Sequence, residues 1–246
     1  MRFWAALEFL TIIPSPIRRE FKEGEIGSSS GYFPLVGLGL GLILFGLDRL
    51  LGLAMPVSVV NILLIIALVI LTGALHLDGF IDTCDGFIAR RSTEERLRAM
   101  SDSRVGAFGV IGACCIILLK YLSLASVPVD LRMAALILMP VLSRWAMVYS
   151  LFAFPYAKGS SGTGYIFKQQ TNWRKMTMAT LIALAPSLIL MGWRGAALMA
   201  GLWVITLGIA SYLRHRLGGH TGDTYGAINE VAEVVTLILL PLIAGV

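Results

Sequence analysis

Three aspartates, Asp78, Asp82 and Asp85, stand in the stretch HLDGFIDTCDGFIAR at residues 76–90. If the stretch is helical, their i, i+4 and i+7 spacing puts the three carboxylates on one face. Like charges so close together repel each other, and a divalent cation reverses the sign of that interaction. Because ligands that are all oxygens favour Mg²⁺, Mn²⁺ or Ca²⁺ over softer metals, the spacing predicts a site for such a cation. The alternative is a helix end whose charges merely face water.

Other residues of the same stretch fit a phosphate site beside a metal ion. Gly79 and Gly86 are poor helix formers, and they favour a place where a phosphate or another helix comes close to the backbone. His76 is either a ligand or an interfacial histidine packed against a neighbour, and the packed histidine is the more usual case. The three cysteines of the chain suit neither a disulfide framework nor a zinc site.

A fourth carboxylate, Asp102, stands with Arg104 at the start of a later apolar segment, in MSDSRVGAFG. Asp102 either caps the helix that begins there or completes a metal site facing Asp82 and Asp85, and the spacing leaves both interpretations open. Upstream, the stretch STEE at 92–95 has the pattern of a capping box and predicts the start of a short amphipathic helix.

Two further polar stretches precede or open apolar segments. AKGSSGTGY at 157–165 has the glycines and hydroxyls of an anion-binding loop. GGHTGDTYGAINE at 218–230 opens the last apolar segment, and it contains Gly222, a candidate for binding a substrate. Asp223 and Glu230 lie at i and i+7 and therefore on one helix face. Glu230 lies about one turn inside the apolar segment, where a carboxylate is costly unless it is paired.

Two cations, Lys120 and Arg144, lie inside other apolar segments. Their position predicts that they face the interior of a helix bundle and meet carboxylates or phosphates. The alternative is that both side chains snorkel to an interface, which for Arg144 requires a different helix boundary.

The rest of the chain supplies the elements that position these residues. Of its 246 residues, 57% are hydrophobic and 14% charged, and the mean hydropathy is +0.81. A soluble domain needs roughly twice this charged fraction. The sequence predicts an all-α, polytopic integral membrane bundle with about seven spans, each able to cross a hydrocarbon core of roughly 30 Å. The spans are predicted near 33–54, 57–75, 106–127, 133–154, 176–192, 196–213 and 231–246.

The whole chain, 1–246, is predicted to form a single membrane-embedded domain, because no soluble domain is left over. Residues 1–13, MRFWAALEFLTII, contain Glu8 and run into PSPIRRE. They predict an amphipathic helix lying at the membrane surface rather than a signal peptide.

The Lys and Arg residues outside the spans indicate the orientation. Only Arg49, Arg132 and Arg194 fall on one side of the predicted spans, and the others fall on the side of the N-terminal region. By the positive-inside rule, the second side faces the cytoplasm. This distribution also accounts for the net charge of +5 without nucleic acid as a partner.

Two resemblances follow from these motifs. DTCDGFIAR at 82–90 resembles the first half of the CDP-alcohol phosphotransferase signature, D-x2-D-G-x2-A-R, but Ala99, Ser103 and Ala107 depart from its second half. A closer resemblance covers nearly the whole chain. FLTIIPSP, TGALHLDGFIDTCDGF, MSDSRVGAFG and GGHTGDTYGAINE, in this order and spacing, resemble the cobalamin synthase family (adenosylcobinamide-GDP ribazoletransferase).

The second resemblance implies an inner-membrane enzyme of cobalamin biosynthesis. Such an enzyme joins adenosylcobinamide-GDP to α-ribazole or its 5′-phosphate, releases GMP and yields adenosylcobalamin or its phosphate. Mg²⁺ is the implied cofactor, and the lipid bilayer is the implied partner. A homo-oligomer is compatible with the sequence.

The chemistry assigns hypothetical roles, because charge on the reacting phosphates must be stabilised. The metal ligands are Asp82, Asp85, Asp102 and Asp223, with Asp78 assisting directly or through water. Phosphate oxygens are held by guanidinium groups, and the base is Asp223, Glu230 or His76. The candidates for binding the substrate are Asp78, Gly79, Gly86, Arg90, Arg104, Lys120, Arg144 and Gly222.

Two other functions fit parts of the pattern. A CDP-alcohol phosphatidyltransferase would use a lipid acceptor and release CMP instead of GMP. A cation-coupled transporter would use Asp82 and Asp85 as ion ligands, but transporter sites usually lie near the bilayer midplane at broken helices. Here the carboxylates cluster at the predicted span ends, which favours an active site at the membrane surface.

Overall fold

The computed structural model describes residues 1–17, 19–88, 92–102, 104–157 and 162–245. Within these ranges the chain is helical, and its only β-type pairing is an isolated bridge between Tyr156 and His220. The predicted all-α fold is confirmed.

Six helices in the described ranges are long and apolar enough to cross a membrane. The long apolar runs form them because a helix satisfies its own backbone hydrogen bonds where lipid offers none. They are α3 (Phe33–Leu51), α7 (Ala107–Ala125), α8 (Arg132–Ala153), α10 (Trp173–Met191), α11 (Trp193–Leu217) and α12 (Gly222–Ala244). The protein is therefore a multi-pass membrane protein. Two single-turn elements, η1 (Ser30–Tyr32) and η2 (Val129–Leu131), lead into α3 and α8.

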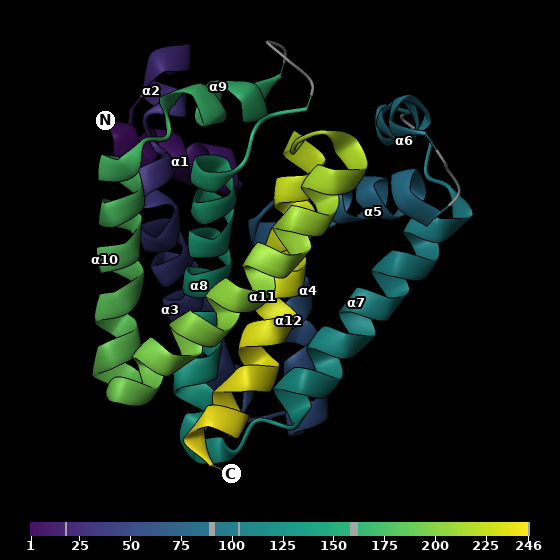
Figure 1. Ribbon diagram of the computed structural model, residues 1–246. Coiled ribbons are helices and arrows are strands. Elements are labelled where there is room, and N and C mark those ends of the chain that lie inside the picture. Colours follow the sequence, from purple (N-terminus) through teal and green to yellow (C-terminus); the bar gives the residue numbers. More distant parts are fainter. Residues whose placement is uncertain (18, 89–91, 103, 158–161, 246) are drawn as a thin grey trace.

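The second predicted span differs from the expectation. α4 (Val57–Leu71) ends at a break, and α5 (Leu75–Ile88) leaves it with a bend of 91°. Gly73 and Ala74 both have φ of +57°, a left-handed conformation that stops the helix. The three aspartates of the 76–90 stretch therefore lie on a helix that runs across one end of the bundle instead of continuing the span (Figure 1).

The centre of the bundle is α8, which packs against α3 on one side and α12 on the other (Figure 1). Of its most apolar window, 89% is buried inside the protein, so α8 faces other helices and not lipid. The Gly-rich start of α3 allows the close contact: a Cβ at Gly37 would lie 2.2 Å from the Pro140 carbonyl oxygen. This is the close packing of small residues that is typical of membrane helices.

Short helices gather at the end of the bundle where α5 lies. They are α1 (Arg2–Leu10), α2 (Glu23–Gly27), α6 (Thr93–Met100) and α9 (Thr163–Gln170). α1 is the helix predicted for the N-terminus, and it buries Ala6 and Leu10 against the bundle. α6 begins at the predicted capping box, in which the Ser92 hydroxyl accepts from the Glu95 backbone N–H at 3.1 Å.

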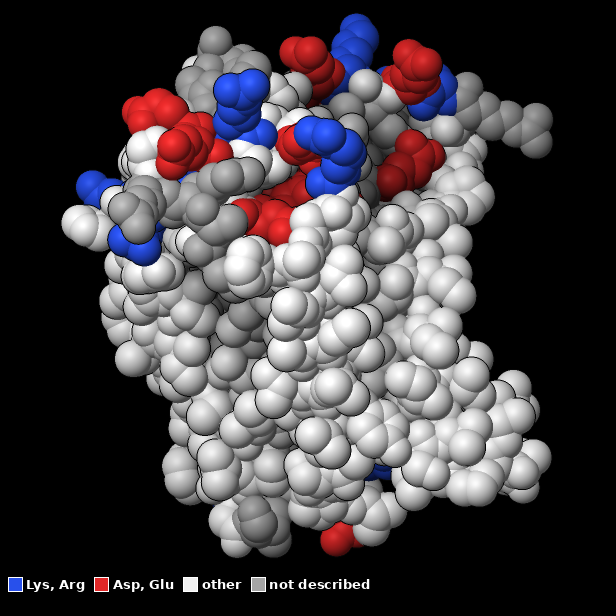
Figure 2. Space-filling model, turned by 90° about the vertical axis from the view of Figure 1, so that its right-hand side faces the viewer, with Lys and Arg blue, Asp and Glu red and all other residues white. Residues whose placement is uncertain are grey.

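Charge is distributed unequally along the bundle. Figure 2 shows acidic and basic side chains gathered at the end with the short helices, above a broad surface of other residues. The opposite end carries a smaller cluster, in which Arg132 of α8 donates to Asp48 of α3 at 2.6 Å and to Asn61 of α4 at 2.7 Å. Exposed tryptophans begin α10 and α11, as expected where helices cross a membrane–water interface: Trp173 and Trp193.

Candidate active site

A pocket of about 400 Å³ opens at the end of the bundle that carries the short helices. One wall is polar and comes from the first turns of α5 and α12 and from the segment before α9. The opposite wall is apolar and comes from α1, α3, α8 and α9. The predicted site residues on the lining are His76, Asp78, Gly79, Gly222 and Asp223.

The polar wall depends on a close crossing of α5 and α12. A Cβ at Gly79 would lie 2.7 Å from the Asp223 carbonyl oxygen, and one at Gly226 would lie 2.9 Å from the His76 carbonyl oxygen. Only glycine fits at two such contacts. The crossing brings Asp78 and Asp223, which are far apart in the sequence, to the same pocket.

Asp223 is positioned by the start of its own helix. Thr221 caps α12, and its hydroxyl also donates to a carboxylate oxygen of Asp223 at 3.1 Å. The same polar turn moves the start of α12 to Gly222, nine residues before the predicted start of the last span. Asp223 is half-buried, whereas Asp78 is exposed.

Asp85 has a structural role that the sequence did not suggest. Its carboxylate accepts from the backbone N–H groups of Gly106 and Gly109, at 2.7 and 2.8 Å, at the N-terminus of α7. A carboxylate there satisfies otherwise unpaired amides and interacts favourably with the helix dipole. Both positions need glycine, since a Cβ at either would lie 2.4 Å from an Asp85 oxygen. The GAFG motif thus accommodates Asp85.

Asp102 does not cap α7, so that interpretation is wrong. It accepts instead from the backbone N–H of Arg104 at 3.0 Å and from its guanidinium at 3.1 and 2.9 Å. The bond from the Arg104 guanidinium lowers the pKa of Asp102 to about 2. Both side chains are exposed, and neither lines the pocket.

The predicted metal ligands are Asp82, Asp85, Asp102 and Asp223. Within the ranges that the structure describes, no group of three or more His, Cys, Asp or Glu side chains is arranged to hold a metal ion. Asp82 is half-buried on α5 and does not line the pocket. The two carboxylates on the pocket lining are those of Asp78 and Asp223.

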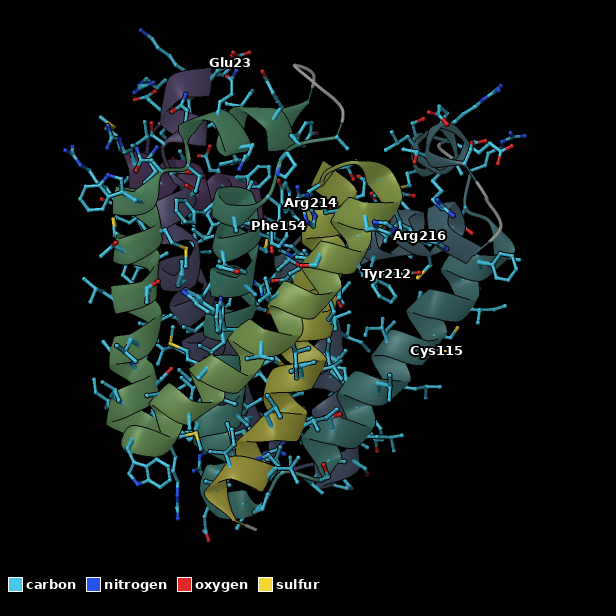
Figure 3. All side chains as sticks on the ribbon, in the orientation of Figure 1. Glu23, Cys115, Phe154, Tyr212, Arg214 and Arg216 are labelled. Atoms are coloured by element: carbon cyan, nitrogen blue, oxygen red, sulfur yellow. The ribbon has the colours of Figure 1, made fainter. Side chains whose placement is uncertain are left out.

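Gly86 lies at a close contact between two helices, which is one of the two expectations for it. A Cβ there would lie 2.5 Å from the Met100 side chain of α6. α6 in turn contacts the end of α11, where Thr93 and Arg96 donate to the Arg216 carbonyl oxygen at 3.2 and 3.3 Å. Arg216 and Arg214 lie at that end of α11 (Figure 3). Arg90, a predicted phosphate ligand, falls outside the described residues.

His76 is almost fully buried, with 1% of its surface exposed, yet it contributes to the pocket lining. Neither ring nitrogen has a hydrogen-bond partner among the described residues. His76 is therefore a buried histidine whose ring nitrogens are neither hydrogen-bonded among the described residues nor exposed to the pocket surface.

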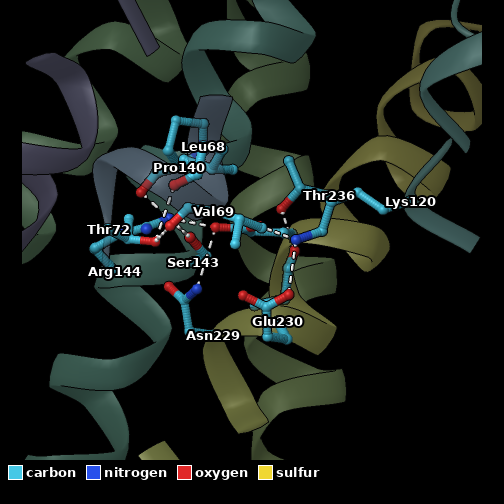
Figure 4. Close-up of polar contacts among 12 residues, drawn as sticks. Leu68, Val69, Thr72, Lys120, Pro140, Ser143, Arg144, Asn229, Glu230 and Thr236 are labelled. Carbon is cyan, nitrogen blue, oxygen red and sulfur yellow. Dashed lines mark hydrogen bonds and ion pairs between the residues drawn. The ribbon is translucent and has the colours of Figure 1, made fainter. Parts of the chain in front are cut away.

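Below the pocket, four buried charged residues form one network (Figure 4). The Lys120 ammonium of α7 donates to Glu230 at 2.7 Å and to Glu233 at 2.6 Å, both on α12. Arg144 of α8 donates to the other oxygen of Glu233. Asn229 also donates to Glu233, at 3.1 Å.

The network shows which of the two expectations for Lys120 and Arg144 holds. Lys120 and Arg144 face the interior and meet carboxylates, as predicted, and they do not snorkel. None of Lys120, Arg144 and Glu230 lines the pocket, so the roles predicted for them in phosphate binding and as the base gain no support. Glu233 was missed, although a second carboxylate one turn after Glu230 in an apolar segment was the available signal.

Comparison with known proteins complements this geometry. The family described as "Cobalamin-5-phosphate synthase" matches residues 2–241 of the chain. The chain belongs to this family. Among curated relatives, the adenosylcobinamide-GDP ribazoletransferase of Geotalea daltonii is 38% identical over 99% of this chain and 98% of its own. That of Desulforamulus reducens is 40% identical over 96% and 94%. No solved structure matches.

Membership of the cobalamin-5-phosphate synthase family confirms the closer resemblance seen in the sequence motifs. Three of the four motifs that carried it come together in space, since HLDG supplies α5, GAFG holds Asp85 and GGHTGD opens α12. The three motifs can lie together because each contains a glycine where two of the helices α5, α7 and α12 come into close contact.

The sequence reasoning missed the aromatic residues of the pocket. Phe9, Phe33, Tyr156, Phe167 and Tyr225 line it and come from five separate segments. Burial, and then the charge of Asp223, raise the pKa of Tyr156, so its hydroxyl stays protonated. Nearby, His220 stacks on Tyr225 with ring centroids 5.4 Å apart and meets Phe154 edge-on. No periodicity marks these residues, because their grouping depends on how the helices pack.

Proposed function

We propose that this protein joins adenosylcobinamide-GDP to α-ribazole or its 5′-phosphate, releasing GMP and giving adenosylcobalamin or its 5′-phosphate. The observation that carries the proposal is the match of almost the whole chain to relatives named adenosylcobinamide-GDP ribazoletransferase. The pocket, with its two carboxylates at one wall, is the place where the described residues could do this chemistry.

The reaction breaks a phosphoanhydride bond of the pyrophosphate and forms a phosphate diester. A ribose hydroxyl oxygen forms a bond to the β-phosphorus of the GDP group, and the bond from that phosphorus to the bridging oxygen breaks. GMP leaves with the electron pair, and the hydroxyl proton passes to a base. Positioning and stabilisation of charge on the phosphates supply most of the catalysis in such reactions.

Mg²⁺ is the proposed cofactor, and the donor set at the pocket fits it. Mg²⁺ is usually held by one or two carboxylates together with substrate phosphates and water. Asp78 and Asp223 supply two carboxylates at one pocket, and Asp223 is already oriented by Thr221. When bound there, Mg²⁺ would neutralise charge that develops on the phosphate oxygens. This pair replaces the larger set predicted from spacing, in which Asp85 and Asp102 have other partners.

His76 is the proposed base. Of the three candidates, Glu230 is held by Lys120 outside the pocket, and Asp223 is proposed to hold the cation. His76 lines the pocket, and its ring nitrogens have no partner in the described part of the chain; because both nitrogens are buried, the ring must turn toward the pocket to accept the proton. The segment at 162–164, which also lines the pocket, has the composition of the predicted anion-binding loop and would contact a phosphate through its backbone.

The active site is proposed to face the cytoplasm from the cytoplasmic membrane. The end of the bundle with the pocket carries most of the Lys and Arg residues, and such residues are in excess on the cytoplasmic side of membrane proteins.

The decisive experiment is turnover by the purified protein with adenosylcobinamide-GDP and α-ribazole, with and without Mg²⁺. Stoichiometric release of GMP together with formation of adenosylcobalamin, dependent on Mg²⁺, is expected. Release of CMP from a CDP-alcohol with a lipid acceptor would favour a phosphatidyltransferase instead. Uptake of solute into proteoliposomes without chemical conversion would favour a transporter.

A further inference from the structure

The apolar wall of the pocket is built from aromatic rings contributed by distant segments. The ring centroids of Phe9 in α1 and Phe167 in α9 are 4.6 Å apart, and those of Phe33 in α3 and Phe167 are 5.2 Å apart. Met147 and Leu151 of α8 extend the wall. None of these five side chains offers a strong hydrogen-bond donor or acceptor, so the surface that they leave open, chiefly on the half-buried Phe9, suits an apolar group.

The polar atoms at the pocket lie on the other side. Asp78 and Asp223 provide carboxylates, whereas the Tyr225 hydroxyl and the His76 ring nitrogens, which lack partners among the described residues, have almost no exposed surface. A molecule that bridges the pocket would therefore place its charged or hydroxylated part at the start of α5 and α12. Its apolar part would lie against Phe9, Phe33 and Phe167.

The volume limits which substrate part can be enclosed. Pockets of about 300–1,000 Å³ hold ligands of drug size, and this one has about 400 Å³. A corrin macrocycle with its side chains exceeds that size. Besides the adenine of the adenosyl group, which like guanine carries donors and acceptors on its edge, the planar groups that remain are the guanine of the GDP moiety and the dimethylbenzimidazole base of the ribazole.

Chemistry separates these two bases. Guanine carries several donors and acceptors on its edge, and each would be buried without a partner against a wall of phenylalanine, methionine and leucine. Dimethylbenzimidazole carries two methyl groups and one free ring nitrogen. Its burial removes apolar surface from water and leaves at most one polar atom to satisfy.

We propose that the aromatic wall of Phe9, Phe33 and Phe167 is the specificity site for the benzimidazole base of the acceptor riboside. This rests on the proposed function, from which the two substrates are taken. The ribose then lies toward Asp78, Asp223 and His76, and the guanosine of the donor lies outside the aromatic part of the pocket. The residues of this wall select the acceptor and contribute nothing to selection of the donor.

The test is equilibrium binding to the purified protein, measured by calorimetry for three ligands: α-ribazole, the same riboside without the two methyl groups, and GMP. The wild-type chain is expected to bind α-ribazole at least about 10-fold more tightly than the unmethylated riboside, because an apolar pocket discriminates single methyl groups by about that factor or more. GMP is expected not to displace α-ribazole. These measurements need no variant.

A matched pair of variants adds the residue-level test. Phe167→Leu is expected to weaken binding of α-ribazole at least about 10-fold and to reduce the discrimination between the two ribosides. Phe45→Leu makes the same change at the opposite end of α3, where Phe45 lies beneath Arg49, and should leave both affinities within about twofold.

Two results would overturn the proposal. One is displacement of α-ribazole by GMP together with weaker GMP binding in the Phe167→Leu variant, which would give the wall to guanine. The other is the absence of methyl discrimination in the wild-type chain. If α-ribazole binds as expected but adenosylcobinamide-GDP releases no GMP, the proposed reaction fails while the base site stands.

Discussion

At the scale of the residue, Asp78 and Asp223 share a pocket but differ in their surroundings. Asp78 is exposed, whereas Asp223 is half-buried and accepts a hydrogen bond from Thr221. The held carboxylate is the better-oriented ligand for a cation, because little reorganisation is needed when phosphate arrives. Asp223 should therefore dominate the contribution of the pair to turnover.

We expect Asp223→Asn to lower kcat/KM for GMP release by roughly 100-fold or more, since removal of one group that stabilises developing charge typically costs that much. The protein should remain folded, as judged by its thermal unfolding in detergent. Asp130→Asn, the same change at an exposed position in η2, is the control and should behave as the wild-type chain. Turnover within about threefold of wild type for Asp223→Asn would contradict the assignment.

The sequence predicted the identity of the site residues better than their roles. Asp78, Gly79, Gly222 and Asp223 were named from motif and spacing, and all four line the pocket. Spacing could not distinguish a carboxylate that faces a ligand from one that caps a neighbouring helix. Asp85 shows the difference, because its partners, Gly106 and Gly109, lie on a segment whose approach depends on the fold.

At the scale of the element, the junction of α5 and α7 depends on Asp85. Asp85→Ala leaves the N–H groups of Gly106 and Gly109 without their acceptor, which costs about 1–3 kcal/mol for each buried group. We expect a lower thermal midpoint and a matching loss of turnover. Asp78→Ala, on the same helix but exposed, should reduce turnover without changing the midpoint.

This pair of variants separates two causes of lost activity. If Asp85→Ala loses turnover with an unchanged midpoint, its carboxylate acts in the chemistry and the capping role is secondary. Asp85→Asn retains one acceptor oxygen, so its midpoint should fall between those of the wild-type chain and Asp85→Ala.

The buried network makes a second prediction at this scale. Glu233→Gln leaves the network with one uncompensated cation, and breaking a buried pair in this way costs about 3–5 kcal/mol. Arg144→Met together with Glu233→Gln restores a neutral pair of Lys120 and Glu230. We expect the double variant to be more stable than Glu233→Gln alone, measured by unfolding in mixed micelles. A double variant that is less stable would refute charge balance as the reason.

The elements themselves were largely predictable, and their junctions were not. Apolar runs placed the six long helices, because a helix in lipid must be apolar over its exposed length. The bend between α4 and α5 was missed, since Gly73 and Ala74 sit in an otherwise helical pattern and only Gly73 is a usual breaker. The early start of α12 was missed because its first turns are polar but packed against other helices.

At the scale of the whole molecule, the orientation in the membrane can be measured with one helix. Arg174 and Arg194 begin α10 and α11, and both are exposed, with α10 between them. In a chain whose native cysteines are replaced by alanine, Arg194→Cys should react with a membrane-impermeant thiol reagent added to intact cells. Arg174→Cys should react only after the membrane is permeabilised. The reverse pattern would place the pocket on the outer side.

The buried network also has a consequence for how the protein is made. The ribosome completes Lys120 and Arg144, in α7 and α8, well before it reaches Glu230 and Glu233 in the last helix. Until α12 arrives, two cations face one another in the half-built bundle with no counter-charge, and each is costly in lipid. Insertion of α12 thus supplies the counter-charges that complete the bundle in the membrane. A chain truncated before α12 should be recognised by quality-control proteases and degraded, even though every earlier helix is present.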